Sequence, residues 1–218
     1  MLTVIIPTLN AGNTLRACLA AVELAEQIIV VDGGSTDDTI AVARGAGARV
    51  IGSAKGRGVQ LKAGGDAATE DWMLFLHADT RLGRTWREAV AAHIEHSPGS
   101  AGYFRFLLDD DAWQARAIER GVAVRTAILG LPYGDQGLLI SRGLYQAAGG
   151  FRPLPLMEDI DLARRVGRRR IKLLGECAWT SAERWRRNGW LRRSARNLAC
   201  VGLYAIGVAP EKIAKFYA

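Results

Sequence analysis

The feature that most constrains the fold is a series of short, unbroken apolar runs separated by stretches with helical spacing. Such runs occupy residues 2–9, 26–32, 48–53 and 72–79. Strands that are buried on both faces have this character, because neither side of them meets water. The alternation therefore predicts an α/β chain, in which a mostly parallel sheet is flanked by helices on both faces.

The segments between these strands have the signals of helix starts. In the first, apolar residues recur at helical spacing, and Asn13 or Thr14 is expected to cap its start. The second is expected to open at Ser35 or Thr36, with two aspartates in its first turn, where the helix dipole favours carboxylates. A glycine-rich turn, GRGVQLKAGG, leads into the third.

The second half of the chain is less regular. Strands are expected at 101–109, at 137–141 and from 171 onward, and helices at 111–130, at 157–170 and through the C-terminal segment. No Pro- or Ser-rich linker divides the chain, so we expect a single domain over residues 1–218. Residues 186–218 would form a helical extension of it, suited to a peripheral position on a membrane.

Several classes of protein are disfavoured by the sequence. The N-terminus MLTVIIPTLN lacks a basic region and a cleavage site, so it does not read as a secretory signal, and no apolar run is long enough to span a bilayer. The three cysteines, Cys18, Cys177 and Cys200, show neither zinc spacing nor a disulfide framework. These features predict a cytoplasmic protein, with the inner face of the membrane as a further location.

Positive charge is concentrated late in the chain. Residues 164–196 contain 12 Lys or Arg and two Asp or Glu, a local net charge of +10 in a chain of net charge +7, so the remainder carries −3. Trp179, Trp185 and Trp190 are interleaved with these basic residues. The stretch suits a phosphorylated ligand or an anionic membrane surface. The alternative is a solvated helix face, and no nucleic acid partner is expected.

Two carboxylates follow strands that should end at the same edge of the sheet. Asp32 closes the second run and Asp79 the fourth, and ligands of open α/β sheets bind beyond the carboxyl ends of the strands. Carboxylates suit Mg²⁺ or Mn²⁺, and His77, two residues before Asp79 on an extended chain, would point the same way and favour Mn²⁺. His77 is expected either to bind the metal directly or to form a hydrogen bond beside it.

A second acidic group lies at the predicted start of a later helix. Glu158, Asp159 and Asp161 are three carboxylates within four residues. Their mutual repulsion raises the pKa of one of them, whereas the helix N-terminus acts in the opposite direction. Such a pair can activate an acceptor hydroxyl. The alternative is an ordinary charged first turn.

The order of these motifs resembles a known family. The segments VIIPTLNAGNTL, IIVVDGGSTDDT, GRGVQLKAGGDAA, FLHADT and MEDIDL together resemble a family 2 glycosyltransferase of the GT-A fold, over residues 2 to about 185. Within that family the chain is similar to the selenodomain-associated transferase 2 subgroup. The resemblance implies an inverting, metal-assisted transferase that takes a nucleotide-diphosphate sugar, with UDP or GDP as the nucleotide.

The resemblance also implies roles for individual residues on the donor side. The positions that match the nucleotide-contacting loops are Pro7, Thr8, Asn10, Arg57 and Gln60. Asp32 matches the carboxylate that binds the base of the donor. Asp79 matches the last acid of the D-x-D motif, which holds Mn²⁺ or Mg²⁺ on the diphosphate.

On the other side of the site, Asp159 matches the catalytic base, with Glu158 beside it. The positions implied on the acceptor side are Asp135, Gln136, Arg184 and Trp185. The acceptor itself is not readable from the sequence, and a lipid-linked molecule would suit the basic, tryptophan-bearing stretch.

The chain departs from the family pattern at two positions. His77 replaces the first acid of D-x-D, and Ser181 stands where a glutamine precedes the Arg-Trp pair in some members. His77 leaves open a nucleotide-sugar-binding protein without turnover. A sugar-1-phosphate nucleotidyltransferase is a second alternative, which the absence of Lys or Arg before Arg16 disfavours. A phosphatase of the D-x-D-x-T type is excluded, because His77 occupies the place of its nucleophile.

Overall fold

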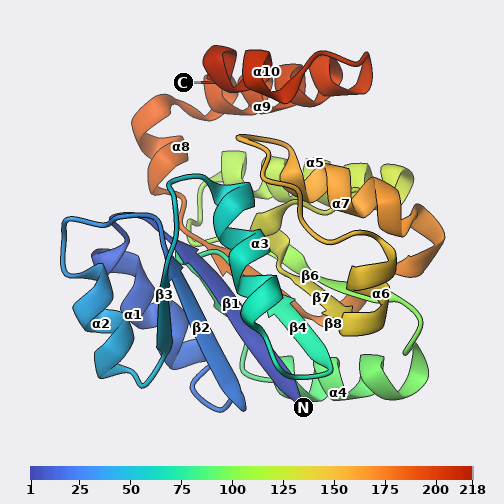
Figure 1. Ribbon diagram of the computed structural model, residues 1–218. Coiled ribbons are helices and arrows are strands. Elements are labelled where there is room, and N and C mark those ends of the chain that lie inside the picture. The colour runs from blue at the N-terminus through green and yellow to red at the C-terminus, as the bar shows by residue number, and fades with distance from the viewer. Residues whose placement is uncertain (218) are drawn as a thin grey trace.

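A computed structural model describes residues 1–217. It contains one eight-stranded sheet in the order β3-β2-β1-β4-β7-β6-β8-β5, flanked by helices on both faces (Figure 1). Four of the seven strand pairings in the described residues are parallel. The sheet is therefore mixed, and three of its four parallel pairings join strands of the first half of the chain.

The first half forms the parallel part. Its strands are β1 (Leu2–Thr8), β2 (Gln27–Asp32), β3 (Arg49–Gly52) and β4 (Trp72–Phe75), and its helices are α1 (Gly12–Ala21), α2 (Thr39–Gly45) and α3 (Arg57–Ala67). In the register, Thr8 lies beside Asp32 and Asp32 beside Gly52. The loops after these strands consequently leave from one edge of the sheet.

The second half adds the antiparallel pairings. Its strands are β5 (Thr80–Leu82), β6 (Ala101–Leu108), β7 (Leu138–Ser141) and β8 (Ile171–Thr180), and its helices are α4 (Trp86–His96), α5 (Trp113–Leu129), α6 (Arg142–Ala147) and α7 (Glu158–Val166), with short 3₁₀ turns at Gly134–Gln136 and Arg168–Arg170. β7 runs antiparallel to both β4 and β6, whereas β8 is parallel to β6 and antiparallel to β5.

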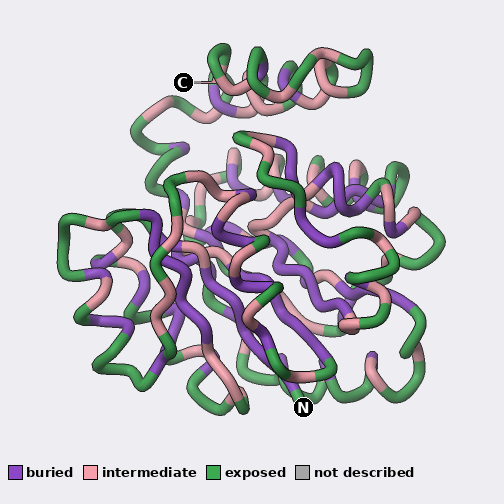
Figure 2. Tube along the Cα trace, in the orientation of Figure 1, coloured by how far each residue is buried: buried purple, intermediate pink, exposed green. Residues whose placement is uncertain are grey.

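The core consists of two layers, one on each face of the sheet, and it accounts for the unbroken apolar runs. Along β1, Val4 and Ile6 pack against α1, α2 and α4, while Ile5 packs on the opposite side against α3, α6 and α7. All three side chains are fully buried. Figure 2 shows the buried strands running through the centre of the molecule, with exposed residues on the loops and outer helix faces.

The C-terminal segment is helical, as expected, and lies above the body of the molecule (Figure 1). It comprises α8 (Glu183–Asn188), α9 (Trp190–Ala205) and α10 (Pro210–Tyr217). Cys200 and Ile213 are buried against Met157 and Ile160 at the start of α7. No helix among residues 1–217 is both long and apolar enough to cross a membrane.

The helix starts differ from those expected. α1 begins at Gly12, before Asn13, and the carboxylate of Asp37 accepts the Gly12 N–H instead of a local cap (3.0 Å). α2 begins only at Thr39, so the acidic pair precedes it. The carboxylate of Asp37 also accepts hydrogen bonds from Thr39, which ties the two loops together. A cap supplied from another loop cannot be read from local sequence.

Two elements were missed and one strand is shorter than expected. The short strand β5 follows Asp79 directly and the helix α4 begins at Trp86, in a stretch for which no element was predicted. β4 ends at Phe75, and the Thr80 N–H donates to the His77 carbonyl (3.1 Å). The segment that carries His77 and Asp79 is therefore a tight turn rather than an extended strand.

Candidate active site

A cleft of about 550 Å³ opens beyond the carboxyl ends of β1 and β4. Eight of the predicted site residues line it: Pro7, Thr8, Asn10, Arg57, Gln60, His77, Asp79 and Arg184. Lys55 and Arg187 add two more cations to its walls. This distribution of charge suits an anionic ligand such as a nucleoside diphosphate.

Asp32 shapes this cleft from behind. Its side chain is buried and does not line the cleft. The carboxylate accepts hydrogen bonds from the Thr8 hydroxyl (3.2 Å) and from the N–H groups of Gly34 (2.9 Å) and Ser35 (2.8 Å). Burial raises the pKa of Asp32, but hydrogen bonds from Ser35, Gly34 and Thr8 outweigh it and hold the pKa below its ordinary value. Contact with the base of a nucleotide thus stays a prediction for this residue.

Gln60 and Asn10 also hold the loops of the cleft. The Gln60 amide donates to the carbonyls of Thr8 (2.7 Å) and Val31 (2.8 Å), so it clamps the ends of β1 and β2. Asn10 adopts a left-handed conformation with φ 50°, and its side-chain oxygen accepts the Thr36 N–H (2.8 Å). Both side chains therefore have a structural role in the loops, and their contact with a nucleotide stays a prediction.

A second, smaller cavity of about 160 Å³ adjoins the cleft beneath α9 and α10. Its walls include the predicted Asp135, Asp159 and Trp185. Four residues line both spaces: Arg57, His77, Asp79 and Arg184. The two spaces therefore meet at these side chains, with the metal-binding candidate Asp79 at the junction.

The start of α7 places its carboxylates differently from one another. Met157, directly before the helix, has φ 68°, a strained conformation for a residue with a side chain. Glu158 is 1% exposed and forms an ion pair with Arg57. Burial raises the pKa of Glu158, and Arg57 opposes the shift. Glu158 thus links α7 to Arg57, which lines the cleft. Glu158 itself does not line the smaller cavity, whereas Asp159 does.

Asp159 is the member of the acidic group that lines the smaller cavity. Its carboxylate accepts the N–H of Gly134 (2.9 Å) and of Ile160 (2.8 Å), which fixes its orientation. The carboxylate of Asp161 points elsewhere and is bound by Arg152 (3.2 Å) and Arg165 (2.5 Å). The geometry therefore separates one candidate base from two structural acids.

His77 is packed beneath the 3₁₀ turn that follows α5. A Cβ atom on Gly134 would come within 2.4 Å of the His77 Nε2, so only glycine fits there. Neither ring nitrogen hydrogen-bonds to a residue in the described part of the chain. Burial, together with the positive charges of Arg57 and Arg184, lowers the pKa of His77 well below its ordinary value. The ring is neutral at physiological pH, the form in which imidazole binds metals.

Asp79 and His77, at the junction of the two spaces, fit a metal ion only when a bound ligand supplies further donor atoms. Within residues 1–217 no group of three or more His, Cys, Asp or Glu side chains is arranged to hold a metal ion. Asp79 faces the cleft, with Arg184 4.0 Å from its carboxylate, and His77 is the nearest neutral donor along the chain. One or two protein ligands are enough for Mg²⁺ or Mn²⁺ where substrate phosphates complete the shell.

The predicted acceptor residues Asp135 and Gln136 lie on the same turn but face opposite ways. Asp135 lines the smaller cavity, whereas Gln136 is 1% exposed and lies outside it. The Gln136 side chain accepts hydrogen bonds from Arg125 (3.2 Å) and from the Tyr133 N–H (3.2 Å). Gln136 therefore holds the turn that presents Asp135 to the cavity.

Sequence reasoning missed several residues of the cavity. Tyr133 lines it, with the guanidinium of Arg125 3.4 Å from the centre of its ring. Asn197 and Arg193 reach it from α9, and Cys200 closes its far side. These residues come from separate elements, so no local pattern in the sequence could have grouped them.

The basic stretch at 164–196 is largely engaged within the fold. Arg186 is bound by Asp110 (2.6 Å), and the guanidinium of Arg193 lies over the Trp185 ring at 4.6 Å. Arg184 and Arg187 instead line the larger cleft. A phosphorylated ligand in the cleft would meet these two side chains, and each of the partners expected for this stretch stays a prediction.

Asp135→Asn should stabilise the protein increasingly as pH rises. Burial, with the nearby charges of Asp159 and Asp79, raises the pKa of Asp135 to about 6. The folded state therefore holds this proton more tightly than the unfolded state, and stability is lost between about pH 4 and 6 as the carboxyl ionises. The variant avoids that loss, so its advantage over wild type should grow by about 2 kcal/mol from pH 4.5 to 7.5.

Urea unfolding at the two pH values measures this difference. Asp71→Asn serves as a control, because Asp71 is exposed and lies outside both cavities. A free-energy difference between Asp135→Asn and wild type that stays constant with pH would contradict the burial of this charge.

Comparison with known proteins identifies the family. The family model described as "Glycosyl transferase family 2" matches residues 3–138. A PGL/p-HBAD biosynthesis glycosyltransferase of Mycobacterium bovis is 38% identical over 116 residues, which cover 47% of this chain and 45% of the relative. An uncharacterized glycosyltransferase of Mycobacterium tuberculosis is 41% identical over 78 residues, covering 35% and 36%. The chain thus spans about half the length, or less, of these curated relatives.

Solved structures agree with the fold. S. aureus TarS superposes with a TM-score of 0.66 at 16% identity, over 83% of this chain and 36% of that one. Glucosyl-3-phosphoglycerate synthase from Mycobacterium tuberculosis gives a TM-score of 0.57 at 21% identity, over 79% and 67%. The predicted GT-A fold is confirmed. Since the family model covers more than half of its residues, the chain belongs to glycosyl transferase family 2.

Proposed function

We propose that this protein transfers a sugar from a nucleotide-diphosphate sugar to an acceptor hydroxyl, with inversion at the anomeric carbon. The observation that carries the proposal is the junction of the two spaces at Asp79. A cationic cleft large enough for a nucleotide lies on one side, and a cavity with a fixed carboxylate, Asp159, on the other. A sugar on the diphosphate would project from the first space into the second.

The structural neighbours support the choice of donor. S. aureus TarS has been crystallised with UDP-GlcNAc and with UDP. The Mycobacterium tuberculosis synthase has been crystallised with Mn²⁺ and UDP-glucose. We propose a UDP- or GDP-sugar for this chain, because Lys55, Arg57, Arg184 and Arg187 all line the cleft in which its diphosphate would lie.

The reaction needs one base and one stabilised leaving group. Asp159 accepts the proton of the acceptor hydroxyl while the oxygen forms its bond to the anomeric carbon. The bond from that carbon to the diphosphate oxygen breaks at the same time, and its electron pair leaves with the nucleoside diphosphate. Hydrogen bonds from Gly134 and Ile160 keep the Asp159 side chain aimed during this displacement.

Departure of the diphosphate places negative charge beside Asp79. A bound Mg²⁺ or Mn²⁺ would supply Lewis-acid neutralisation of that charge, with Asp79 holding it and His77 as the second protein donor. Arg184, near the Asp79 carboxylate, and Arg57, at the junction, contribute positive charge from the protein itself. Charges that already lie beside the leaving group lower the barrier, because less reorganisation is needed as the diphosphate departs.

A thermal-shift screen tests the proposal. UDP- and GDP-sugars should raise the unfolding midpoint in the presence of Mn²⁺ or Mg²⁺, because a ligand that binds only the folded state stabilises it. The stabilising donor should then be consumed when acceptors are added. Stabilisation without consumption would support a nucleotide-sugar-binding protein instead, and pyrophosphate release from a nucleoside triphosphate would support a nucleotidyltransferase. No response to any nucleotide sugar would contradict the proposal.

A further inference from the structure

A third cavity, of about 770 Å³, lies between α5 and the α8–α9 segment and is mostly apolar. Phe106, Ile118 and Val122 form one wall, and Trp190 and Leu198 come from the other. This is within the volume range of sites that enclose small molecules. We call this space, defined by its lining from α5, α8 and α9, the apolar groove.

The apolar groove adjoins the cavity that holds Asp159. Four residues line both spaces: Tyr133, Asp135, Trp185 and Asn197. The opposite end of the groove reaches exposed apolar side chains, since Trp113 is 73% and Leu191 85% exposed. The groove therefore extends from the molecular surface to side chains that also line the reaction cavity.

Polar atoms without partners lie along the groove. The Trp185 Nε1, the Asp135 Oδ1 and the Ser194 Oγ are buried and form no hydrogen bond with any residue in the described part of the chain. Trp185 is only 6% exposed. Buried polar groups nearly always have a partner, so these atoms indicate a ligand with polar groups at the inner end of the groove.

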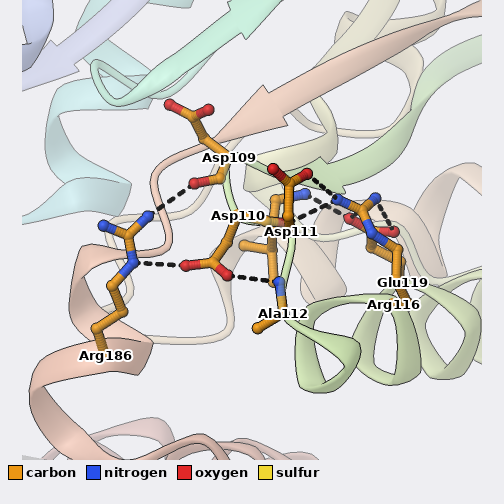
Figure 3. A network of polar contacts seen from close by, with 8 residues as sticks. Asp109, Asp110, Asp111, Ala112, Arg116, Glu119 and Arg186 are labelled. Atoms are coloured by element: carbon orange, nitrogen blue, oxygen red, sulfur yellow. Dashed lines mark hydrogen bonds and ion pairs between the residues drawn. The ribbon is translucent and has the colours of Figure 1, made fainter.

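Hydrogen bonds connect the two walls of the groove, so the fold sets the distance between them. Figure 3 shows Arg186 of α8 donating to the Asp110 carboxylate (2.6 Å) and to the Asp109 carbonyl (2.8 Å), in the loop before α5. The same Asp110 side chain accepts the Ala112 N–H (2.8 Å) at the start of α5. The Trp185 and Phe106 rings pack with their centres 6.3 Å apart.

We infer that the acceptor is an amphiphile, with its apolar chain in the apolar groove and its hydroxyl presented to Asp159. This rests on the proposed function, because it names the acceptor class of that site. An apolar chain matches the lining, and a polar head at the inner end would meet the unpartnered atoms of Asp135 and Trp185. The exposed apolar side chains at the outer end would receive the remainder of a longer chain.

Gly121 of α5 offers a way to fill the groove. It lines the groove, and a Cβ atom added there would meet no atom within 4 Å. Gly121→Leu should therefore fold and occupy the space. Ala117→Phe fills the same wall one helical turn earlier. Gly202→Leu on α9 is the matched control, because Gly202 also has open space around it but lines neither the groove nor the reaction cavity.

Binding of monomeric cis-parinaric acid, followed by energy transfer from tryptophan, tests the inference on the intact protein. Wild type and Gly202→Leu should bind the probe saturably. Gly121→Leu and Ala117→Phe should bind it at least about tenfold more weakly, because each added side chain occupies space that the probe's apolar chain needs and so reduces the apolar area that the probe can bury. All four proteins should bind UDP equally in the presence of Mn²⁺. Unlabelled fatty acids should displace the probe better as they lengthen.

Each other outcome has a defined meaning. Absence of saturable probe binding, or equal binding by the groove-filling variants, overturns the amphiphile inference and leaves the proposed function standing if UDP still binds. Absence of UDP binding to wild type with the probe still bound overturns the proposed function and the acceptor role, and leaves the groove only as a site that binds amphiphiles. A wild-type dimer that Gly121→Leu dissociates shows that a second copy fills the groove. Binding to anionic vesicles without binding of the monomeric probe shows a membrane-facing surface. Either result, the dimer or vesicle binding alone, contradicts the inference.

Discussion

Asp159→Asn should lower the rate of sugar transfer by about 10²–10⁴-fold while leaving donor binding unchanged. The variant keeps an oxygen that can accept the Gly134 N–H, so the turn beside it should keep its position. It cannot take a proton from the acceptor, and a base acts in the chemical step only. Single-turnover measurement of transfer, with titration of UDP and Mn²⁺ as the binding control, separates the two effects.

Asp161→Asn is the matched control for this experiment. Asp161 lies half a turn further along α7, but Arg152 and Arg165 hold its carboxylate outside the cavity. Its loss should lower the free energy of unfolding and leave the rate per folded molecule near that of wild type. Should Asp159→Asn transfer at a near wild-type rate, the base is another residue, and Asp135, which lines the same cavity, is the next candidate.

The parallel half of the fold could be predicted from the sequence because its signals are local. The run at 2–9 needs burial on both faces, and Val4, Ile5 and Ile6 are all fully buried on alternating sides of β1. The antiparallel half could not be predicted in the same way. The short strand β5 exists because Thr80 and Leu82 pair with residues about 100 positions later in β8, and such pairing leaves no local period.

The candidate site shows the same division. The sequence pattern placed Asp79 after a strand and Asp159 at a helix start, and the family resemblance implied their roles as metal ligand and base. The structure brings both to the walls of one cavity. The tasks of Asp32 and Gln60 within the loops could not be predicted, because they depend on which backbone groups the folded chain leaves unpaired. Tyr133, in the loop after α5, was not predicted either, because no local sequence pattern marks it as a residue of the site. It enters the site through tertiary packing alone.

Asp79→Asn should abolish the metal dependence of nucleotide binding and leave the fold intact. Among residues 1–217, Asp79 is the one carboxylate that lines both the cationic cleft and the reaction cavity, so we expect it to be the charged ligand of the metal. Losing one charged partner of a partly buried ion costs about 3 kcal/mol, or roughly a 100-fold loss of affinity. The unfolding midpoint without nucleotide should stay within a few degrees of wild type, since Asp79 forms no short ion pair in the described structure.

Titration calorimetry of UDP and GDP in Mn²⁺ tests the central claim most directly, with wild type, Asp79→Asn and Asp159→Asn compared under the same conditions. We expect one of the two nucleotides to bind wild type and Asp159→Asn with equal affinity. EDTA should remove this binding, and Asp79→Asn in Mn²⁺ should behave like wild type in EDTA. Equal affinity of wild type and Asp79→Asn in the presence of Mn²⁺ would contradict that claim.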